Sequence, residues 1–126
     1  MLSAEIFSQF VQAINDHNIK VIVALMTPDH LFVDSLGHSF KGAASMEAGW
    51  SGYFSMCPDY WIRADEVLAE AGVVLAVGEA GGTIDGVAWR TPAAWKAAIH
   101  NGAVSEWRVF ADNKPVYDIL AKSPRS

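Results

Sequence analysis

Residues 73–111 decide the fold, and they read VVLAVGEAGGTIDGVAWRTPAAWKAAIHNGAVSEWRVFA. Asp85-Gly86 and Asn101-Gly102 interrupt this largely apolar stretch, and both pairs supply the positive φ angles that tight hairpin turns require. A further turn at Glu70-Ala71-Gly72 precedes them, so we expect four consecutive antiparallel strands. The expected strands span residues 60–69, 73–83, 88–100 and 103–111.

The part of the chain before Pro58 carries helical patterns instead. Apolar residues recur at three- and four-residue spacing after Ser3, which is a plausible N-cap. Asn18 can cap a short second helix that Pro28 ends, and Pro58 blocks the exit of a third. The expected helices span residues 3–16, 18–26, 43–56 and, in the tail, 116–120, and two short strands span 31–34 and 39–41.

Helices that precede strands indicate an α+β domain in which the helices pack on one face of an antiparallel sheet. The length of 126 residues suits one domain, residues 1–126. Gly78, Gly81 and Gly82 fall inside a strand and indicate a bend in a curved sheet.

Charged residues make up only 18% of the chain. This scarcity suggests apolar surface hidden in a subunit interface, a ligand cavity or both.

Charge and cysteine content exclude several classes of function. The formal net charge is −5 and no basic residues cluster, which argues against nucleic acid and anionic membrane partners. The single cysteine, Cys57, cannot form an internal disulfide and fits a reducing compartment. The N-terminus does not resemble a signal peptide, and no apolar run is long enough to cross a bilayer, so we expect a cytoplasmic protein. The four histidines form no metal pattern, and no cofactor fingerprint occurs, so we expect neither metal nor cofactor.

Three segments carry a resemblance to a known superfamily: FVQAIN at 10–15, LFVDSLG at 31–37, and NGAVSEWRVFADN at 101–113. In this order, over residues 3–120, the chain resembles the nuclear transport factor 2-like superfamily, in its SnoaL-like and ketosteroid-isomerase-like branches. The resemblance implies a cone-shaped fold in which helices close over a strongly curved, mainly antiparallel sheet, in the order α-α-β-β-α-β-β-β-β. It also implies a pocket at the open end of the cone and a homodimer formed through the sheets.

Asp34 is the first candidate for a catalytic residue. In ketosteroid isomerases an Asp within an Asp-x-x-Gly turn is the general base, and Asp34 matches that position. Strand alternation also places Asp34 on the face of Phe32, where loss of solvation would make the carboxylate a better base. The alternative is an Asp that caps the turn at 35–37 by accepting bonds from backbone N–H groups.

Glu79 is the second catalytic candidate, because a carboxylate in mid-strand needs a wet or functional face. We expect it to share a pocket-facing side with Val77 and to pair with Asp34 as acid and base; the alternative places it on the outer face at a dimer contact. The chain departs from the isomerases at Phe10, where the family has an oxyanion-binding Tyr. The second acid of the family falls near Trp95 or Lys96.

The ligand-binding candidates are aromatic and apolar side chains. Five tryptophans in 126 residues suggest a pocket for a flat or apolar molecule, with ordinary core and dimer packing as the alternative. Trp50 and Trp107 are expected to form the pocket walls. The full set is Phe10, Phe32, Trp50, Tyr53, Val77, Trp95 and Trp107.

The resemblance and the residues together predict a small-molecule protein of proton-transfer type, an isomerase or a cyclase. Asp34 would take a proton from the carbon beside a carbonyl group of an apolar substrate. The alternative is a homodimeric protein that binds an apolar metabolite without turnover. The absence of the family's Tyr and second acid favours that alternative, because a base without an oxyanion hole lacks a large electrostatic contribution.

Overall fold

The computed structural model describes residues 2–122, which form helices and strands in the predicted order. The helices are α1 (Ser3–Asn15), α2 (Ile19–Ala24), α3 (Ala43–Met56) and α4 (Lys114–Lys122). The strands are β1 (Met26–Val33), β2 (Ser39–Lys41), β3 (Trp61–Glu70), β4 (Val73–Ile84), β5 (Val87–His100) and β6 (Ala103–Ala111).

The strands form one six-stranded sheet in the order β2-β1-β6-β5-β4-β3. Neighbouring strands are antiparallel except β1 and β6, which run parallel. Asp85 and Asn101 have φ angles of 51° and 49°, each followed by a glycine with positive φ, so both predicted hairpin turns are confirmed.

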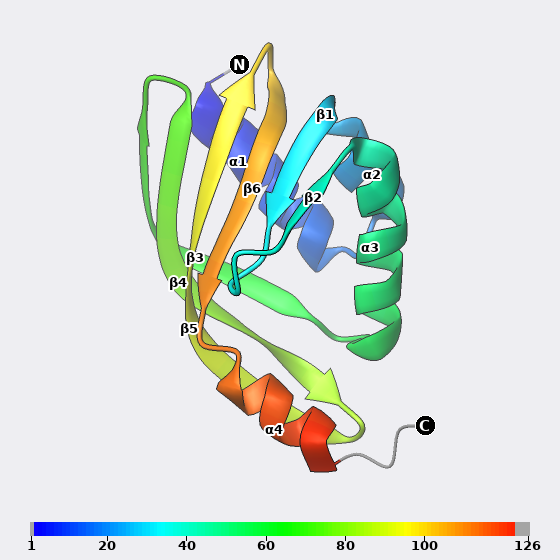
Figure 1. Ribbon diagram of the computed structural model, residues 1–126. Helices are drawn as coiled ribbons and strands as arrows, with labels where there is room; N and C mark the ends of the chain where they lie inside the picture. Colours follow the sequence, from blue (N-terminus) through cyan, green and yellow to red (C-terminus); the bar gives the residue numbers. More distant parts are fainter. Residues whose placement is uncertain (1, 123–126) are drawn as a thin grey trace.

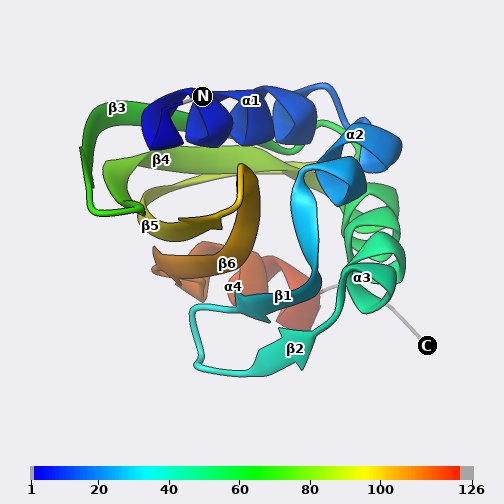
Figure 2. The ribbon, with the colours of Figure 1, turned by 90° about the horizontal axis from the view of Figure 1, so that it is seen from above.

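The sheet is strongly curved, and helices close its concave side. Figure 1 shows α3 standing opposite strands β3 to β6, with α4 across the lower end of the sheet. Seen from above, the sheet curls from β4 through β5, β6 and β1 to β2, with α1 along one side and α3 at another (Figure 2). The prediction of an α+β cone with a curved, mainly antiparallel sheet is therefore confirmed.

A break in the pairing of β3 with β4 contributes to the curvature. The register shifts between Ala64 and Glu66, and Gly78 of β4 lies against this bulge. A Cβ atom at Gly78 would collide with the backbone carbonyl of Arg63, so only glycine lets the two strands approach this closely.

Helix α1 packs across the concave face of the sheet, mainly against β3 and also against β4, β5 and β6. Its buried stripe comprises Ile6, Phe7, Phe10, Ala13 and Ile14. The rings of Phe7 and Phe10 lie against Trp107 at centroid distances of 5.5 and 4.8 Å. This aromatic contact joins the helix to the sheet and leaves the remaining concave surface facing α3.

Two predictions about the N-terminal half are wrong. Ser3 lies inside α1, because Leu2 occupies the N-cap position and makes no side-chain capping bond. Helix α2 ends at Ala24, and Pro28 lies within β1 at an exposed point where the pairing with β6 is interrupted. A proline is compatible with a strand at such a point, because no ladder hydrogen bond is required of it. The predicted cap at Asn18 is confirmed, since its side chain accepts a bond from Val21 N at 3.2 Å.

No helix within residues 2–122 is long and apolar enough to cross a membrane.

Candidate functional site

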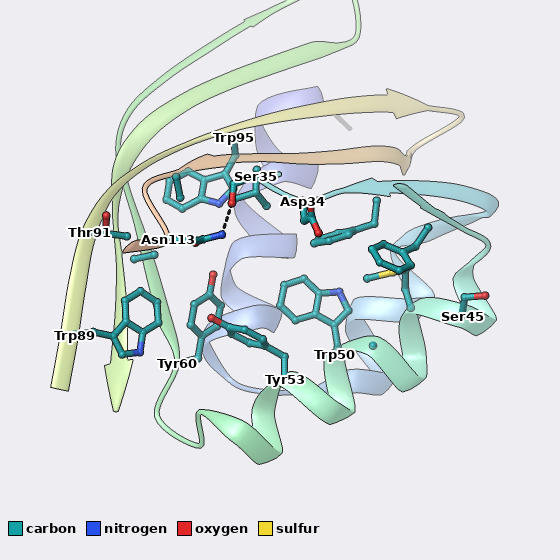
Figure 3. A pocket seen from close by; sticks show the side chains of 17 residues that line it. Asp34, Ser35, Ser45, Trp50, Tyr53, Tyr60, Trp89, Thr91, Trp95 and Asn113 are labelled. Carbon is teal, nitrogen blue, oxygen red and sulfur yellow. Dashed lines mark hydrogen bonds between the residues drawn. The ribbon is translucent and has the colours of Figure 1, made fainter. Parts of the chain in front are cut away.

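A cavity of about 310 Å³ lies between α3 and the concave face of the sheet (Figure 3). Its size is within the range of small-molecule sites, which begins at about 300 Å³. Aromatic side chains from α3, β1, β2, β5 and the segment before β3 form most of its wall: Phe32, Phe40, Trp50, Tyr53, Tyr60, Trp89 and Trp95.

Regular spacing within two elements places the wall residues. Trp89, Thr91 and Trp95 occupy alternate positions of β5, so all three face the concave side, where each is buried. Trp50 and Tyr53 are three residues apart on α3, which puts both on the helix face turned toward the sheet. Ala80 on β4 and Ala111 on β6 line the cavity with small side chains, and the space that they leave open is part of its volume.

Tyr60 links the helical wall to the sheet wall. Its ring meets Tyr53 nearly at right angles, with centroids 4.8 Å apart and planes at 83°. On its other side it stacks toward Trp89 at 6.2 Å, and Trp50 lies 6.5 Å away. These contacts fix the phenol between three aromatic neighbours, so this part of the wall is preorganised.

Polar groups gather at one end of the cavity. Asn113 Nδ2 donates a short hydrogen bond to Ser35 Oγ, and Thr91 Oγ1 donates to the carbonyl of Asp112 at 2.8 Å. In Figure 3 the hydroxyl of Tyr60 points toward the end where Asn113 and Ser35 lie. That hydroxyl has no hydrogen bond to any of residues 2–122, so it is available to a ligand.

The tyrosine hydroxyls of the cavity stay protonated. Burial is the main cause that raises the pKa of Tyr60 and of Tyr53 far above the ordinary value for a phenol, and neighbouring ionisable groups add to the rise. Both side chains therefore present neutral O–H donors over the whole range in which the protein would function.

Asp34 lies at the rim of the cavity, directly after β1, on the same side as Phe32. Its Oδ1 accepts hydrogen bonds from the backbone N–H groups of Leu36 and His38, each at 2.9 Å. Its Oδ2 lies 3.3 Å from Nδ1 of His38, and the Asp34 side chain is 30% exposed. Asp34 therefore caps its turn and also faces the cavity, which combines the two alternatives that the sequence left open.

Glu79 does not face the cavity, so the prediction of an Asp34–Glu79 pair is wrong. Its carboxylate lies on the outer face of the sheet, where it binds Arg63 Nη2 at 2.6 Å and Arg90 Nε at 2.9 Å. Val77 shares this outer face and is 47% exposed, so it is not a wall residue either. Strand β4 carries apolar or small residues on both faces, and alternation by itself therefore could not identify the inner one.

Phe10 and Trp107 belong to the core and not to the cavity wall. They are 0% and 1% exposed and pack against each other beneath α1. The two positions near which the second acid of the isomerases falls are separated by strand alternation: Trp95 faces the cavity, whereas Lys96 lies outside, 3.3 Å from Glu106. Of the predicted site residues, the structure brings together Asp34, Phe32, Trp50, Tyr53 and Trp95.

The sequence-based selection missed Tyr60, Trp89 and Asn113. Trp89 could have been found, because it lies six residues before Trp95 and thus on the same face of one strand. Tyr60 was expected to start a strand but comes directly before β3, and Asn113 lies two residues after β6, so strand alternation does not fix the direction of either side chain.

Cys57 ends α3 as a fully buried side chain, as expected of a small hydrophobic residue. Burial is the main cause that raises the pKa of its thiol, which keeps it a weak nucleophile. Among residues 2–122, no three His, Cys, Asp or Glu side chains gather as a metal-binding group.

Solved structures with the same architecture match nearly the whole chain. A Shewanella denitrificans OS-217 protein assigned as a SnoaL-like polyketide cyclase superposes with a TM-score of 0.85 at 12% identity, covering 96% of this chain and 98% of its own. A Catenulispora acidiphila DSM 44928 protein with a ketosteroid isomerase-like fold was solved in complex with trimethylamine. It superposes with a TM-score of 0.82 at 18% identity, covering 97% of this chain and 94% of its own. AclR of Streptomyces galilaeus, assigned as a hydroxylase, superposes with a TM-score of 0.80 at 17% identity, covering 98% of this chain and 83% of its own. At these identities the likeness shows the fold.

No curated protein matches the chain by sequence. The family model for the SnoaL-like domain matches residues 7–117, which include α3, the sheet and every cavity residue described above. The chain therefore belongs to the SnoaL-like domain family.

Proposed function

We propose that this protein binds a small, flat, largely apolar carbonyl compound in the aromatic cavity and that Asp34 takes a proton from it. One observation carries the proposal: among residues 2–122, seven aromatic side chains surround about 310 Å³ of space, with a single carboxylate at the rim. Aromatic walls favour flat apolar ligands, and a carboxylate beside them is a suitable general base.

In the proposed step, Oδ2 of Asp34 accepts a proton from the carbon next to the carbonyl group. The electron pair of the broken C–H bond forms a carbon–carbon double bond, and negative charge develops on the carbonyl oxygen as an enolate. Return of the proton to another carbon would give isomerisation, and attack of the enolate carbon on a second carbonyl would give cyclisation.

Tyr60 is the donor that we propose for the enolate oxygen. Its hydroxyl is neutral, its side chain is half-buried, and it has no hydrogen bond to residues 2–122, so it can donate to a developing oxyanion. Asn113 lies at the same end of the cavity and would add a second N–H donor. These two residues would supply the stabilisation that Phe10 cannot, although they come from other parts of the chain.

A second candidate function is ligand binding without turnover. It is favoured by the position of Glu79 on the outer face, because no second acid within the described part of the chain lines the cavity with Asp34. It is also favoured by the bonds that hold both oxygens of Asp34 to its own turn and to His38.

Binding of a panel of flat ketones, followed by quenching of tryptophan fluorescence, tests the part that both candidates share. Ala80→Phe should abolish binding because the larger side chain fills the cavity, whereas Trp61→Leu, a change on the outer face, should not alter it. Asp34→Asn should retain binding. Equal binding by the wild-type protein and Ala80→Phe would contradict the proposed site.

We also propose that the protein is a homodimer joined through the outer faces of its sheets. Leu75, Val77 and Phe110 expose 51%, 47% and 51% of their surface on that face. Val77 and Phe110 flank Ala94 in register, which makes a continuous apolar strip. A two-fold axis would bring this strip against its own copy.

A further inference from the structure

The side chains that line the cavity carry charge of one sign. Asp34 supplies a carboxylate, and no Lys or Arg among residues 2–122 lines the space. Arg63 and Arg90 are on the outer face of the sheet, where Glu79 binds both of them. His38 is beside Asp34, but its side chain is 67% exposed. A ligand carboxylate or phosphate would therefore enter the cavity without a cationic partner, which is strongly unfavourable away from water.

The aromatic wall has the opposite preference. The face of each ring carries the negative part of its quadrupole, and indole attracts cations most strongly. Trp50, Trp89 and Trp95 contribute three indoles to the wall, and Tyr53 and Tyr60 contribute two phenols. The protein as a whole has a formal charge of −5, which adds a weak attraction for cations at a distance.

We propose that the ligand of this cavity carries a tertiary or quaternary ammonium group on its apolar body. The inference rests on the proposed function, because it concerns the same cavity, and it adds the charge of the ligand to that proposal. A quaternary ammonium is large and has no N–H groups that need partners, so aromatic faces can replace its water shell.

Asp34 would act on the ligand's charge through space. Opposite charges attract over several ångströms, so the ammonium need not touch the carboxylate. Oδ1 of Asp34 is held by two backbone N–H groups, which fixes the position of the negative charge. Replacing Asp34 with Asn removes the charge and keeps an oxygen that can accept the same two bonds.

Three probes of nearly equal shape but different charge test the inference by isothermal titration calorimetry. They are benzoylcholine, its neutral isostere 3,3-dimethylbutyl benzoate, and the anion 3-benzoyloxypropanoate. All three have a flat ring and a carbonyl group, and none has a hydrogen on the carbon next to that carbonyl, so each reports binding alone. We expect benzoylcholine to bind about tenfold more tightly than the neutral isostere and the anion not to bind measurably.

Two variants test whether the preference for the cationic probe arises in the cavity. Asp34→Asn should lower the affinity for benzoylcholine about tenfold and leave that for the neutral isostere unchanged. Trp61→Leu removes a tryptophan from the outer face and should change neither affinity. Equal or weaker binding of the cation relative to its neutral isostere would overturn the inference and leave the proposed binding site standing. No binding of any probe would overturn both.

Discussion

His38 holds both carboxylate oxygens of Asp34. Its backbone N–H donates to Oδ1 at 2.9 Å, and its Nδ1 lies 3.3 Å from Oδ2. The backbone N–H of Asp34 in turn donates to the carbonyl of His38 at 2.9 Å, so the two residues close the turn between β1 and β2. The carboxylate that we propose as a base is thus also the side chain that organises the rim of the cavity.

This double role predicts different results for two substitutions at Asp34. Asp34→Ala leaves the backbone N–H groups of Leu36 and His38 without their acceptor, and we expect it to lower the free energy of unfolding by about 1–2 kcal/mol. Asp34→Asn keeps an acceptor oxygen and should lower it by less than about 1 kcal/mol. Urea denaturation measures both values. Equal loss in the two variants would show that the turn does not depend on these bonds.

Two glycines provide a matched test of the strand geometry. Gly78→Ala places a Cβ against the carbonyl of Arg63 and should destabilise the fold by about 2–4 kcal/mol, because two strands must separate. Gly52 lies on α3, where a Cβ atom would point into open space. Gly52→Ala should therefore stabilise the protein by up to about 1 kcal/mol through its higher helix propensity. Thermal unfolding measures the stability of both variants. A loss of stability well below about 2 kcal/mol in Gly78→Ala would contradict the close approach of the strands.

Buried His30 should make stability depend on pH. It is 0% exposed, its Nδ1 donates to the carbonyl of Val104 at 2.7 Å, and its Nε2 has no partner among residues 2–122. Burial is the main cause that lowers the pKa of His30 from its ordinary value of 6.5, and the bond to Val104 opposes this only in part. Below about pH 6.5 the unfolded chain therefore binds a proton that the folded protein resists, and stability falls as the pH decreases.

The slope due to one such proton is at most about 1.4 kcal/mol per pH unit. We expect His30→Gln to be less stable at pH 7.5 but to lose less stability than the wild-type protein on acidification to pH 5.5. Subtracting the variant's free energy of unfolding from that of the wild type at each pH cancels the contribution of the other histidines, which both proteins share. Parallel curves for wild type and variant would contradict this assignment.

The proposed dimer interface is tested by a charge on the outer face of the sheet. Val77→Lys should convert a dimer to a monomer in light scattering, because two like charges would meet at the two-fold axis. Val21→Lys alters another exposed apolar residue, on α2, and should leave the dimer intact. A monomeric wild-type protein, or a dimer that persists in Val77→Lys, would contradict the interface.

Strong local signals predicted much of the fold. The bounds of α3 and β6 agree with the sequence prediction, because Pro58 ends the helix and Asn101-Gly102 starts the strand. Pro28 misled the prediction, since its place in a strand depends on an interruption in pairing with β6, a strand far away in the sequence. Local propensity contains no information about that interruption.

The site was less predictable than the fold. Alternation along β1 correctly placed Phe32 and Asp34 on the cavity side. The same rule failed at Glu79, because the outer face of β4 carries apolar residues in place of polar ones. Tyr60 and Asn113 come together only through the curvature of the sheet, which depends on long-range pairing.

Hydrogen exchange at the carbon next to a ketone tests the central proposal most directly, without knowledge of the natural substrate. 2-Tetralone, a flat apolar ketone, would be incubated with the protein in D₂O and its α-hydrogens followed by NMR. We predict exchange faster than in buffer with the wild-type protein, a return to the buffer rate with Asp34→Asn, and no change with Trp61→Leu. Equal exchange rates in buffer, wild-type protein and Asp34→Asn would contradict proton transfer to Asp34.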